Sequence, residues 1–490
     1  MSKKFKKYLE IQKKHNAYKF AFATIEFDAE TIAPKNGFEI RGEMLGLLGA
    51  EDFKIITNKK YLKLLNNLNE CKKLKADQKR MIELSIKDAE ELEKLPKELY
   101  KKSINLTNNA YMIWQNAKNK SDFELYMPTL NEVINLQKEK LAYFTKKDNY
   151  DYLLDTFEPG FSKKDYDNFF DNFKTEILPS LSKIEGNKLP EFLLAKYDIA
   201  KQKEFNDILM EYLGVDKNTF YCGETEHPFS SQLSMKDVRF CTKYQEKNFI
   251  DSIFSTIHEL GHSFFQAYIN EKYAFTPIET NISMGLHESQ SRLLENYIGR
   301  SKSFWVPLFP KLKKLFPIQL KNVDLDFFIE SINIPLFSFI RTEADELTYT
   351  LHVIVRYEIE KEIFKNKKFD IKSIKQLWND KYQEYLHLLP NADNIGILQD
   401  VHWSGMSFGY FPTYSLGSAI AAQFYNQMKK DINVDQLLSE GDFLSVKKWL
   451  IDNIYQHGAM YKSKDLIKKV CNEEFDANYY IQYLKNKFLK

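Results

Sequence analysis

The chain has few cysteines and lacks any long apolar run, and these absences exclude several classes of protein. Four cysteines occur in 490 residues, and no two of them form a C-x-x-C pair, which argues against a disulfide framework and favours a reducing compartment. The N-terminal sequence MSKKFKKYLE contains no apolar core of a signal peptide, and no run of about 18 apolar residues occurs anywhere. We therefore expect a soluble, cytoplasmic protein with no membrane partner.

An excess of charge of one sign is also absent. Lysine and arginine total 70 and aspartate and glutamate total 68, so the net charge of +2 gives no reason to expect a nucleic-acid partner. Internal repeats and low-complexity linkers are absent too. We therefore expect one catalytic unit over 1–490, made of an N-terminal helical part (1–215), a catalytic core (216–420) and C-terminal helices (421–490).

Helical periodicity dominates what is present. Apolar side chains recur at helical spacing through 39–145, and 43% hydrophobic residues suffice for a sizeable core. Further helices are expected at 247–270, 285–299, 325–331, 336–366, 371–388 and 418–430. The segment 218–245 is instead rich in β-branched and aromatic residues separated by turn formers. The sequence predicts a mostly α fold with a small antiparallel β-sheet beside the helix at 247–270.

The most specific pattern is His258-Glu259-Leu260-Gly261-His262 within that helix. Residues four apart lie on the same helix face, so both imidazoles can reach one metal ion. Glu259 lies beside that face, where it can take a proton from a metal-bound water. The pattern is typical of zinc peptidases, with His258 and His262 as ligands and Glu259 as the catalytic residue.

The third ligand distinguishes classes of zinc peptidase. No third histidine follows at metzincin spacing, whereas Glu288 opens a second helix and can complete a His₂Glu site with an open fourth position. Glu271 and Glu279 lie nearer in sequence, but Glu271 is on or just beyond the first helix and Glu279 is in a turn after Pro277. We favour Glu288 and expect a carboxylate or carbonyl to orient each histidine's other nitrogen.

Six short motifs between residues 227 and 403 resemble those of one family. HPF, DVRxxT, HExxH, HESQ, IRxxAD and GxxQDxHW occur here in the order found in the M32 metallocarboxypeptidases, the carboxypeptidase Taq family, and GYFPTY at 409–414 also matches. The segment 27–45 resembles an early motif of that family, with Phe27 where tryptophan is usual. Cys241 and Met406 replace a common threonine and glycine, and neither is a ligand or the general base.

This resemblance implies a helical fold like that of neurolysin and angiotensin-converting enzyme, with the metal at the base of a long groove. It also implies a homodimer that releases C-terminal amino acids from peptide substrates with broad specificity, but disfavours proline. The implied cofactor is zinc, with cobalt possible. The arginine of DVRxxT, Arg239 here, is implied to limit how far a substrate extends beyond the cleaved bond.

Peptide hydrolysis at a free C-terminus needs further polar groups. A tetrahedral oxyanion needs hydrogen-bond donors, and the motif segments offer His227, His402 and Tyr410. A substrate α-carboxylate suits the planar fork of arginine, so Arg239 and Arg341 are the candidates for binding it. Either arginine could instead brace the structure, for instance through Asp237 or Asp345.

Two other functions are compatible with parts of this pattern. An endo-oligopeptidase of the neurolysin type would share the metal site but need no carboxylate anchor, so it would cleave an amidated peptide. A catalytically inactive helical peptide-binding scaffold would be expected to lose a ligand or the general base, and this sequence retains His258, His262, Glu288 and Glu259.

Overall fold

Helices make up most of the computed structural model, which describes residues 2–146, 148–181, 184, 188–365 and 368–489. The N-terminal helices are α1 (Lys3–Thr31), α2 (Phe38–Ile56), α3 (Lys59–Asn69), α4 (Ala76–Lys94), α5 (Lys97–Lys120), α6 (Met127–Phe144), α7 (Asn149–Phe157), α8 (Lys163–Leu181), α9 (Glu191–Leu194) and α10 (Ile199–Tyr212). None of the described helices has the length and apolarity that crossing a bilayer requires. The predicted mostly helical fold class is confirmed.

The second half of the chain is helical as well. Its helices are α11 (Phe249–Ala267), α12 (Pro277–Thr280), α13 (Met284–Arg292), α14 (Lys302–Trp305), α15 (Phe309–Leu315), α16 (Leu325–Ile332), α17 (Tyr349–Lys365), α18 (Ile374–Leu386), α19 (Pro412–Asp431), α20 (Val434–Ser439), α21 (Phe443–Asn453), α22 (Ser463–Cys471) and α23 (Asn478–Phe488). A π-helical turn, Leu293–Ile298, directly follows α13. Buried apolar side chains from Phe5 to Leu484 form one connected cluster.

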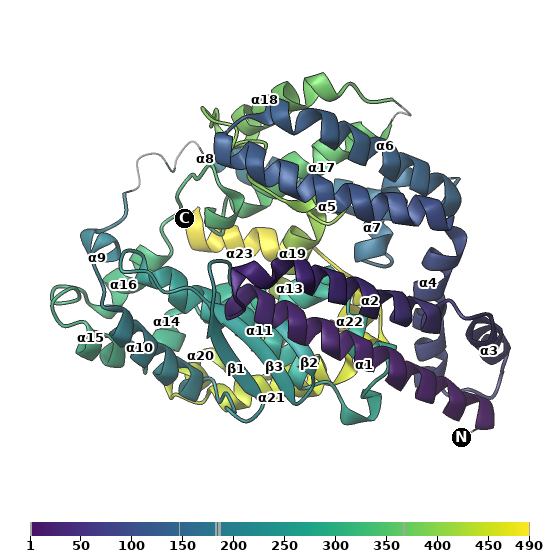
Figure 1. Cartoon of the computed structure of the whole chain (residues 1–490). Coiled ribbons are helices and arrows are strands. Elements are labelled where there is room, and N and C mark those ends of the chain that lie inside the picture. The colour runs from purple at the N-terminus through teal and green to yellow at the C-terminus, as the bar shows by residue number, and fades with distance from the viewer. Residues whose placement is uncertain (1, 147, 182–183, 185–187, 366–367, 490) are drawn as a thin grey trace.

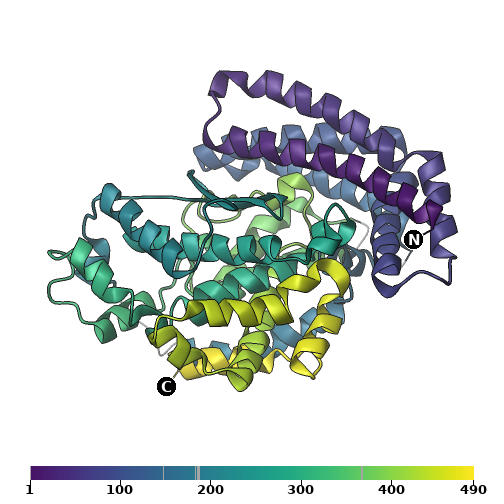
Figure 2. The same cartoon turned by 90° about the horizontal axis from the view of Figure 1, so that it is seen from below.

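The helices pack in groups around the middle of the chain. Helices α5, α6, α17 and α18 lie together at the top of Figure 1, and α1 and α2 cross in front of the lower half. Seen from below, α1 and α2 lie on one side of the middle of the chain, and the C-terminal helices lie on the other side (Figure 2). Helix α11 therefore lies in the interior, in contact with α10, α13 and the sheet.

The sheet is mixed, so the expectation of a wholly antiparallel sheet was wrong. Its strands are β1 (Phe220–Glu224), β2 (Ser230–Ser234) and β3 (Asp237–Thr242), in the order β1-β3-β2. The two residues between β2 and β3 make a tight hairpin, which leaves the other edge of β3 free for β1. β1 pairs there in parallel, because the chain crosses over at 225–229 before the hairpin begins.

Two helices begin at residues other than those predicted from the sequence. The helix expected at 336–366 begins only at Tyr349, and residue 366 lies outside the described part of the chain. Asp345 ends the preceding irregular segment, because its carboxylate accepts hydrogen bonds from the backbone N–H groups of Leu347 and Thr348. The helix expected at 418–430 begins earlier, at Pro412, a residue that favours the first turn of a helix.

Candidate active site

Helix α11 carries three of the predicted site residues, His258, Glu259 and His262. Ile257, Leu260 and Phe264 are fully buried and fix the opposite face against the sheet and neighbouring helices. His258 and His262 therefore project together toward α13, as helical spacing requires. Glu259 is also buried, with 7% of its surface exposed.

Two glycines allow α13 to approach closely on both sides. A Cβ atom at Gly261 would lie 2.5 Å from the carbonyl oxygen of Gln290 and 2.5 Å from the Cα atom of Ser291. A Cβ atom at Gly417 of α19 would lie 2.7 Å from the Cβ atom of Glu288. Since neither contact is sterically possible, only glycine lets α11 and α19 pack directly against the helix that carries Glu288.

The ligand atoms of His258, His262 and Glu288 converge. One ligand atom from each lies within 4.8 Å of the others, and this is the one such group of metal-binding side chains among the described residues. Glu288 Oε2 lies 3.5 Å from His262 Nε2 and 4.0 Å from His258 Nε2. Two imidazole nitrogens and a carboxylate form a donor set that suits zinc. Glu271 and Glu279 lie outside this group.

The second nitrogen of each histidine has a partner. His258 Nδ1 lies 2.8 Å from Glu295 Oε2, and Glu295 belongs to the π-helical turn after α13. His262 Nδ1 lies 3.1 Å from the carbonyl oxygen of His287 and 2.5 Å from Nδ1 of the same residue. The expectation of a carboxylate or carbonyl behind each histidine is confirmed, and these contacts leave both Nε2 atoms facing Glu288.

Arg292 balances the charge of the two carboxylates. Its Nε donates to Glu288 Oε1 at 2.7 Å, and its Nη1 lies 3.4 Å from Glu295 Oε2. Burial by itself would raise the pKa of Glu288, but Arg292 and the two histidines outweigh it and hold the pKa well below the ordinary value. Burial is likewise outweighed at Glu295, whose pKa falls to about 2. Both carboxylates are therefore ionised at neutral pH.

A cavity of about 450 Å³ opens onto these residues. It is lined by His258, Glu259, His262 and Glu288, and also by Phe229, Ser230, Gln232, Met284, Tyr410 and Tyr414. Burial raises the pKa of Glu259, while the neighbouring histidines lower it. A carboxylate with a raised pKa beside the convergent ligand atoms can both accept and return a proton.

The segment from the 3-10 turn His402–Gly405 to Tyr414 carries neutral hydrogen-bonding groups at this cavity. Burial raises the pKa of Tyr410 to about 12, so its hydroxyl stays protonated. Burial lowers the pKa of His402 to about 3, so its imidazole is neutral, and its Nε2 lies 3.0 Å from the hydroxyl of Tyr414. His402 therefore reaches the cavity through Tyr414 rather than directly.

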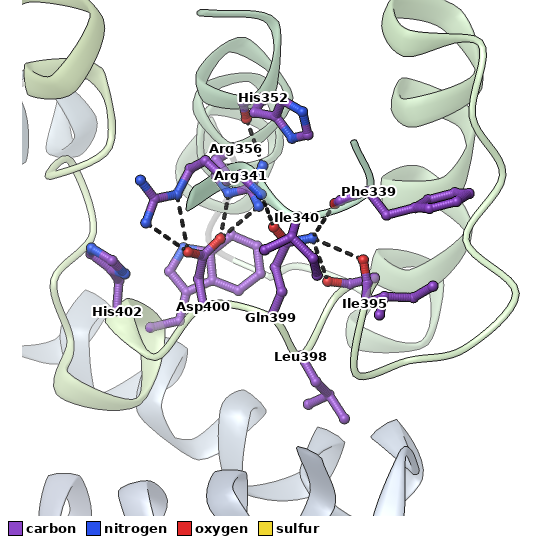
Figure 3. A network of polar contacts seen from close by, with 12 residues as sticks. Phe339, Ile340, Arg341, His352, Arg356, Ile395, Leu398, Gln399, Asp400 and His402 are labelled. Carbon is purple, nitrogen blue, oxygen red and sulfur yellow. Dashed lines mark hydrogen bonds and ion pairs between the residues drawn. The ribbon is translucent and has the colours of Figure 1, made fainter. Parts of the chain in front are cut away.

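Arg341 lies behind the cavity in a buried ion network (Figure 3). Its Nε and Nη2 donate to Asp400 Oδ1 at 3.0 and 2.9 Å, and its Nη1 donates to the hydroxyl of Tyr349 at 2.8 Å. Arg356 binds the other oxygen of Asp400 at 2.6 Å. Arg341 is 5% exposed, and its guanidinium stacks 4.7 Å from the ring centre of Tyr414. A tyrosine thus separates it from the cavity.

Arg239 and His227 also lie outside the cavity lining. Arg239 on β3 donates to both oxygens of Asp237 at 2.9 and 2.8 Å, and its guanidinium lies over Phe27. The bracing partner predicted for Arg239 is therefore present, whereas the partner of Arg341 is Asp400 rather than Asp345. His227 is exposed in the β1–β2 connection, and its neighbours Pro228 and Phe229 line the cavity instead.

The family model of the carboxypeptidase Taq (M32) metallopeptidases matches residues 7–488 of this chain. The chain belongs to this family. It is a metal-dependent carboxypeptidase, and neither the endopeptidase nor the inactive scaffold is favoured.

Individual M32 relatives are similar over almost the whole chain. Carboxypeptidase 1 of Bacillus subtilis (strain 168) is 42% identical over 490 residues, which cover 99% of this chain and 97% of the relative. The solved M32 carboxypeptidase from Deinococcus radiodurans R1 is 29% identical, with 99% of each chain covered and a TM-score of 0.96. A solved PZ peptidase A, 11% identical with a TM-score of 0.63, covers 98% of this chain and 95% of its own and shows similarity of fold alone.

Three site residues of this M32 carboxypeptidase were missed in the sequence. Arg292 and Glu295 lie four and seven residues after Glu288, a spacing that returns to the same helix face and could have identified them. Tyr414 ends the GYFPTY motif, but the motif gave no indication of its role. Its contact with His402 depends on how the chain turns between residues 405 and 411, which local periodicity does not encode.

Proposed function

We propose that this M32 enzyme is a zinc carboxypeptidase in which His258, His262 and Glu288 hold the metal, with cobalt as a possible replacement. The observation that carries the proposal is the convergence of these ligand atoms in a cavity that Glu259 also lines. A bound zinc ion lowers the pKa of a water toward neutrality and polarises the scissile carbonyl. The contacts of Glu295 and His287 fit this role, because they orient each imidazole with its Nε2 toward Glu288.

Glu259 is proposed as the general base and then the general acid. Its carboxylate takes a proton from the attacking water and delivers the proton to the leaving amine. The raised pKa of Glu259 supports both steps, since a carboxyl group whose pKa lies nearer neutrality both accepts and releases a proton readily. Its location between the two histidines keeps the proton close to the reacting atoms.

Tyr410 is proposed as the principal protein donor to the tetrahedral oxyanion. Its hydroxyl is protonated and its side chain lines the cavity with the ligand residues. His402 is proposed to act through the hydroxyl of Tyr414, and His227 is the remaining candidate donor. An exposed histidine next to Pro228 would have to turn inward when a peptide binds.

Family membership supports the remaining proposals. We propose broad specificity that disfavours proline, peptides as the substrates, a homodimer in the cytoplasm, and one catalytic unit over 1–490. Arg239 and Arg341 remain the two candidates for binding the substrate carboxylate. Each would have to share its guanidinium with, or release, the aspartate that it now binds.

A comparison of acid and amide peptides tests this function. Mass spectrometry of a peptide digest should show stepwise loss of C-terminal residues that a chelator stops, and C-terminal amides should resist cleavage. Replacing the carboxylate-binding arginine with alanine should lower kcat/KM about 30-fold or more on the peptide acid only. Equal losses on acid and amide in both variants would contradict the carboxylate-binding role, and rapid cleavage of amides would contradict the exopeptidase.

A further inference from the structure

The segment 402–410 carries groups of the site but has little regular structure of its own. It consists of a 3-10 turn, His402–Gly405, followed by Met406 with a φ of 59° and Gly409 with a φ of 89°. Tyr410 follows directly and lines the cavity with the convergent ligand residues. Something outside the segment must therefore hold it in place.

The carboxylate of Glu360 binds both ends of this segment. Glu360 lies on α17 and is fully buried. Its Oε1 accepts a hydrogen bond from Trp403 Nε1 at 2.7 Å, and its Oε2 accepts one from the backbone N–H of Gly409 at 2.7 Å. The hydroxyl of Tyr150 on α7 donates to the same Oε2 at 2.9 Å. One side chain thus ties three separate parts of the chain together.

The backbone at Gly409 has no space for a side chain. A Cβ atom there would lie 2.8 Å from the carbonyl carbon of Leu153 on α7, so the backbone of the segment packs directly against that helix. Phe157 of the same helix contacts the ring of Tyr410, with 5.1 Å between ring centres. Helix α7 therefore forms the wall against which Glu360 holds the segment.

We propose that Glu360 is a positioning residue that acts through Trp403 and Gly409 to place the hydroxyl of Tyr410 in the metal-site cavity. The inference rests on the proposed role of Tyr410. A carboxylate is suited to this task because both of its oxygens accept hydrogen bonds, whereas an amide offers only one acceptor. A glutamine at position 360 would therefore release one end of the segment.

The burial of Glu360 is consistent with a specific role. Burial raises its pKa to about 7, even though Trp403, Gly409 and Tyr150 all stabilise its charge. A buried carboxylate is costly to the folded state, and three hydrogen bonds to the segment and to α7 offset part of that cost. An apolar side chain of similar size would pack at lower cost but would hold neither Trp403 nor Gly409.

A double-mutant cycle tests the proposal. Wild type, Glu360→Gln, Tyr410→Phe and the double variant, each loaded with zinc, are assayed on a short peptide acid. Glu360→Gln should lower kcat about 10- to 100-fold with little change in KM, because it misplaces a donor used in the transition state. The double variant should be no slower than Tyr410→Phe. If Glu360→Gln lowers kcat by the same factor in the Tyr410→Phe background as in wild type, the proposal is overturned.

Glu358→Gln is the matched control. Glu358 lies on the same helix two residues earlier, but it binds Lys174 at 2.8 Å and Lys381 at 2.6 Å, away from the segment. This variant should keep the wild-type kcat. A kcat for Glu360→Gln equal to that of Glu358→Gln would overturn the positioning role.

Hydrogen exchange gives a readout that does not depend on activity. Peptides covering 402–411 should exchange faster in Glu360→Gln, whereas peptides covering α13 should not change. If Tyr410→Phe is as active as wild type, the proposed role of Tyr410 fails, and the exchange rates still decide whether Glu360 holds the segment. If Glu360→Gln does not fold, Trp403→Phe removes one hydrogen bond without altering the carboxylate. A wild-type kcat and exchange rate in Trp403→Phe would overturn the proposal.

Discussion

The charge on Glu288 depends on its neighbours more than on its burial. With 7% of its surface exposed, an isolated carboxylate there would be favoured in its protonated form. Arg292 binds one of its oxygens, which leaves the other free to face both histidines. The same arginine reaches Glu295, so one guanidinium contacts a proposed ligand, Glu288, and the carboxylate that orients another proposed ligand, His258. Both carboxylates are therefore ionised at neutral pH, which suits the proposed metal site.

Glu259 is the residue whose replacement best separates chemistry from metal binding. Glu259→Gln should lower kcat by several orders of magnitude, because the amide cannot take the proton of the water. Its zinc content should remain that of wild type, since the proposed ligand atoms belong to His258, His262 and Glu288. Metal analysis and kcat on one peptide acid check both results. Loss of zinc in this variant would show that Glu259 is itself a ligand.

At the scale of elements, two glycines determine the spacing of α11, α13 and α19. Gly261→Ala should lower the free energy of unfolding by about 1–3 kcal/mol and weaken zinc binding, because its Cβ atom would push against the backbone of Gln290 and Ser291. Gly46→Ala on α2 is the control, since a Cβ atom there meets nothing within 4 Å. That change should be neutral or stabilise the helix by up to about 1 kcal/mol. Thermal unfolding and zinc titration of the two variants measure these effects. Equal changes in Gly261→Ala and Gly46→Ala would contradict the packing argument.

The elements that sequence patterns predicted well are those whose contacts are local. Helix α11 was expected at 247–270 and spans Phe249–Ala267, because its own apolar face determines it. The predicted start of α17 was wrong by more than ten residues, because a distant residue holds the backbone before this helix. Gln399 accepts a hydrogen bond from the backbone N–H of Arg341 and donates one to the carbonyl of Phe339. No local pattern encodes a partner that lies 58 residues away.

At the scale of the whole molecule, two buried carboxylates join segments that are distant in sequence. Glu158 follows α7 and accepts hydrogen bonds from the backbone N–H of Gly285 at 2.7 Å and from the hydroxyls of Ser283 and Ser463. It thereby caps the first turn of α13, which carries Glu288, and Ser283 makes no such cap itself. Glu360 performs the corresponding task for the segment that carries Tyr410. Neither role could be predicted from the sequence, where Glu158 lies in the predicted loop around Glu158-Pro159-Gly160 and Glu360 resembles an ordinary helix-surface glutamate.

The raised pKa values of these two buried carboxyl groups predict how each group contributes to the pH dependence of stability. Burial raises the pKa of Glu158 and of Glu360 to about 7, from the ordinary value of 4.5. Between these values each of these two groups is protonated more in the folded state than in the unfolded state, so its contribution to the free energy of unfolding falls as pH rises and levels off above pH 7. Glu288 and Glu295, with lowered pKa values, contribute stability that is lost only as pH falls below about 4.5, so the two effects occupy separate ranges.

Glu158→Gln should therefore remove the contribution of Glu158 to the pH dependence of stability in the metal-free protein between about 5 and 7. The free energy of unfolding of wild type relative to the variant should decrease across this range by up to about 3 kcal/mol, the free energy of a shift of roughly two pKa units. Other titrating groups are common to both proteins and cancel in the difference. Glu358→Gln is the control, because the pKa of Glu358 is lowered rather than raised and its ion pairs persist throughout this range. Parallel curves for wild type and Glu158→Gln would mean that Glu158 is already ionised at pH 5. Its role would then be a permanently charged cap of α13 rather than a group that takes up a proton on folding.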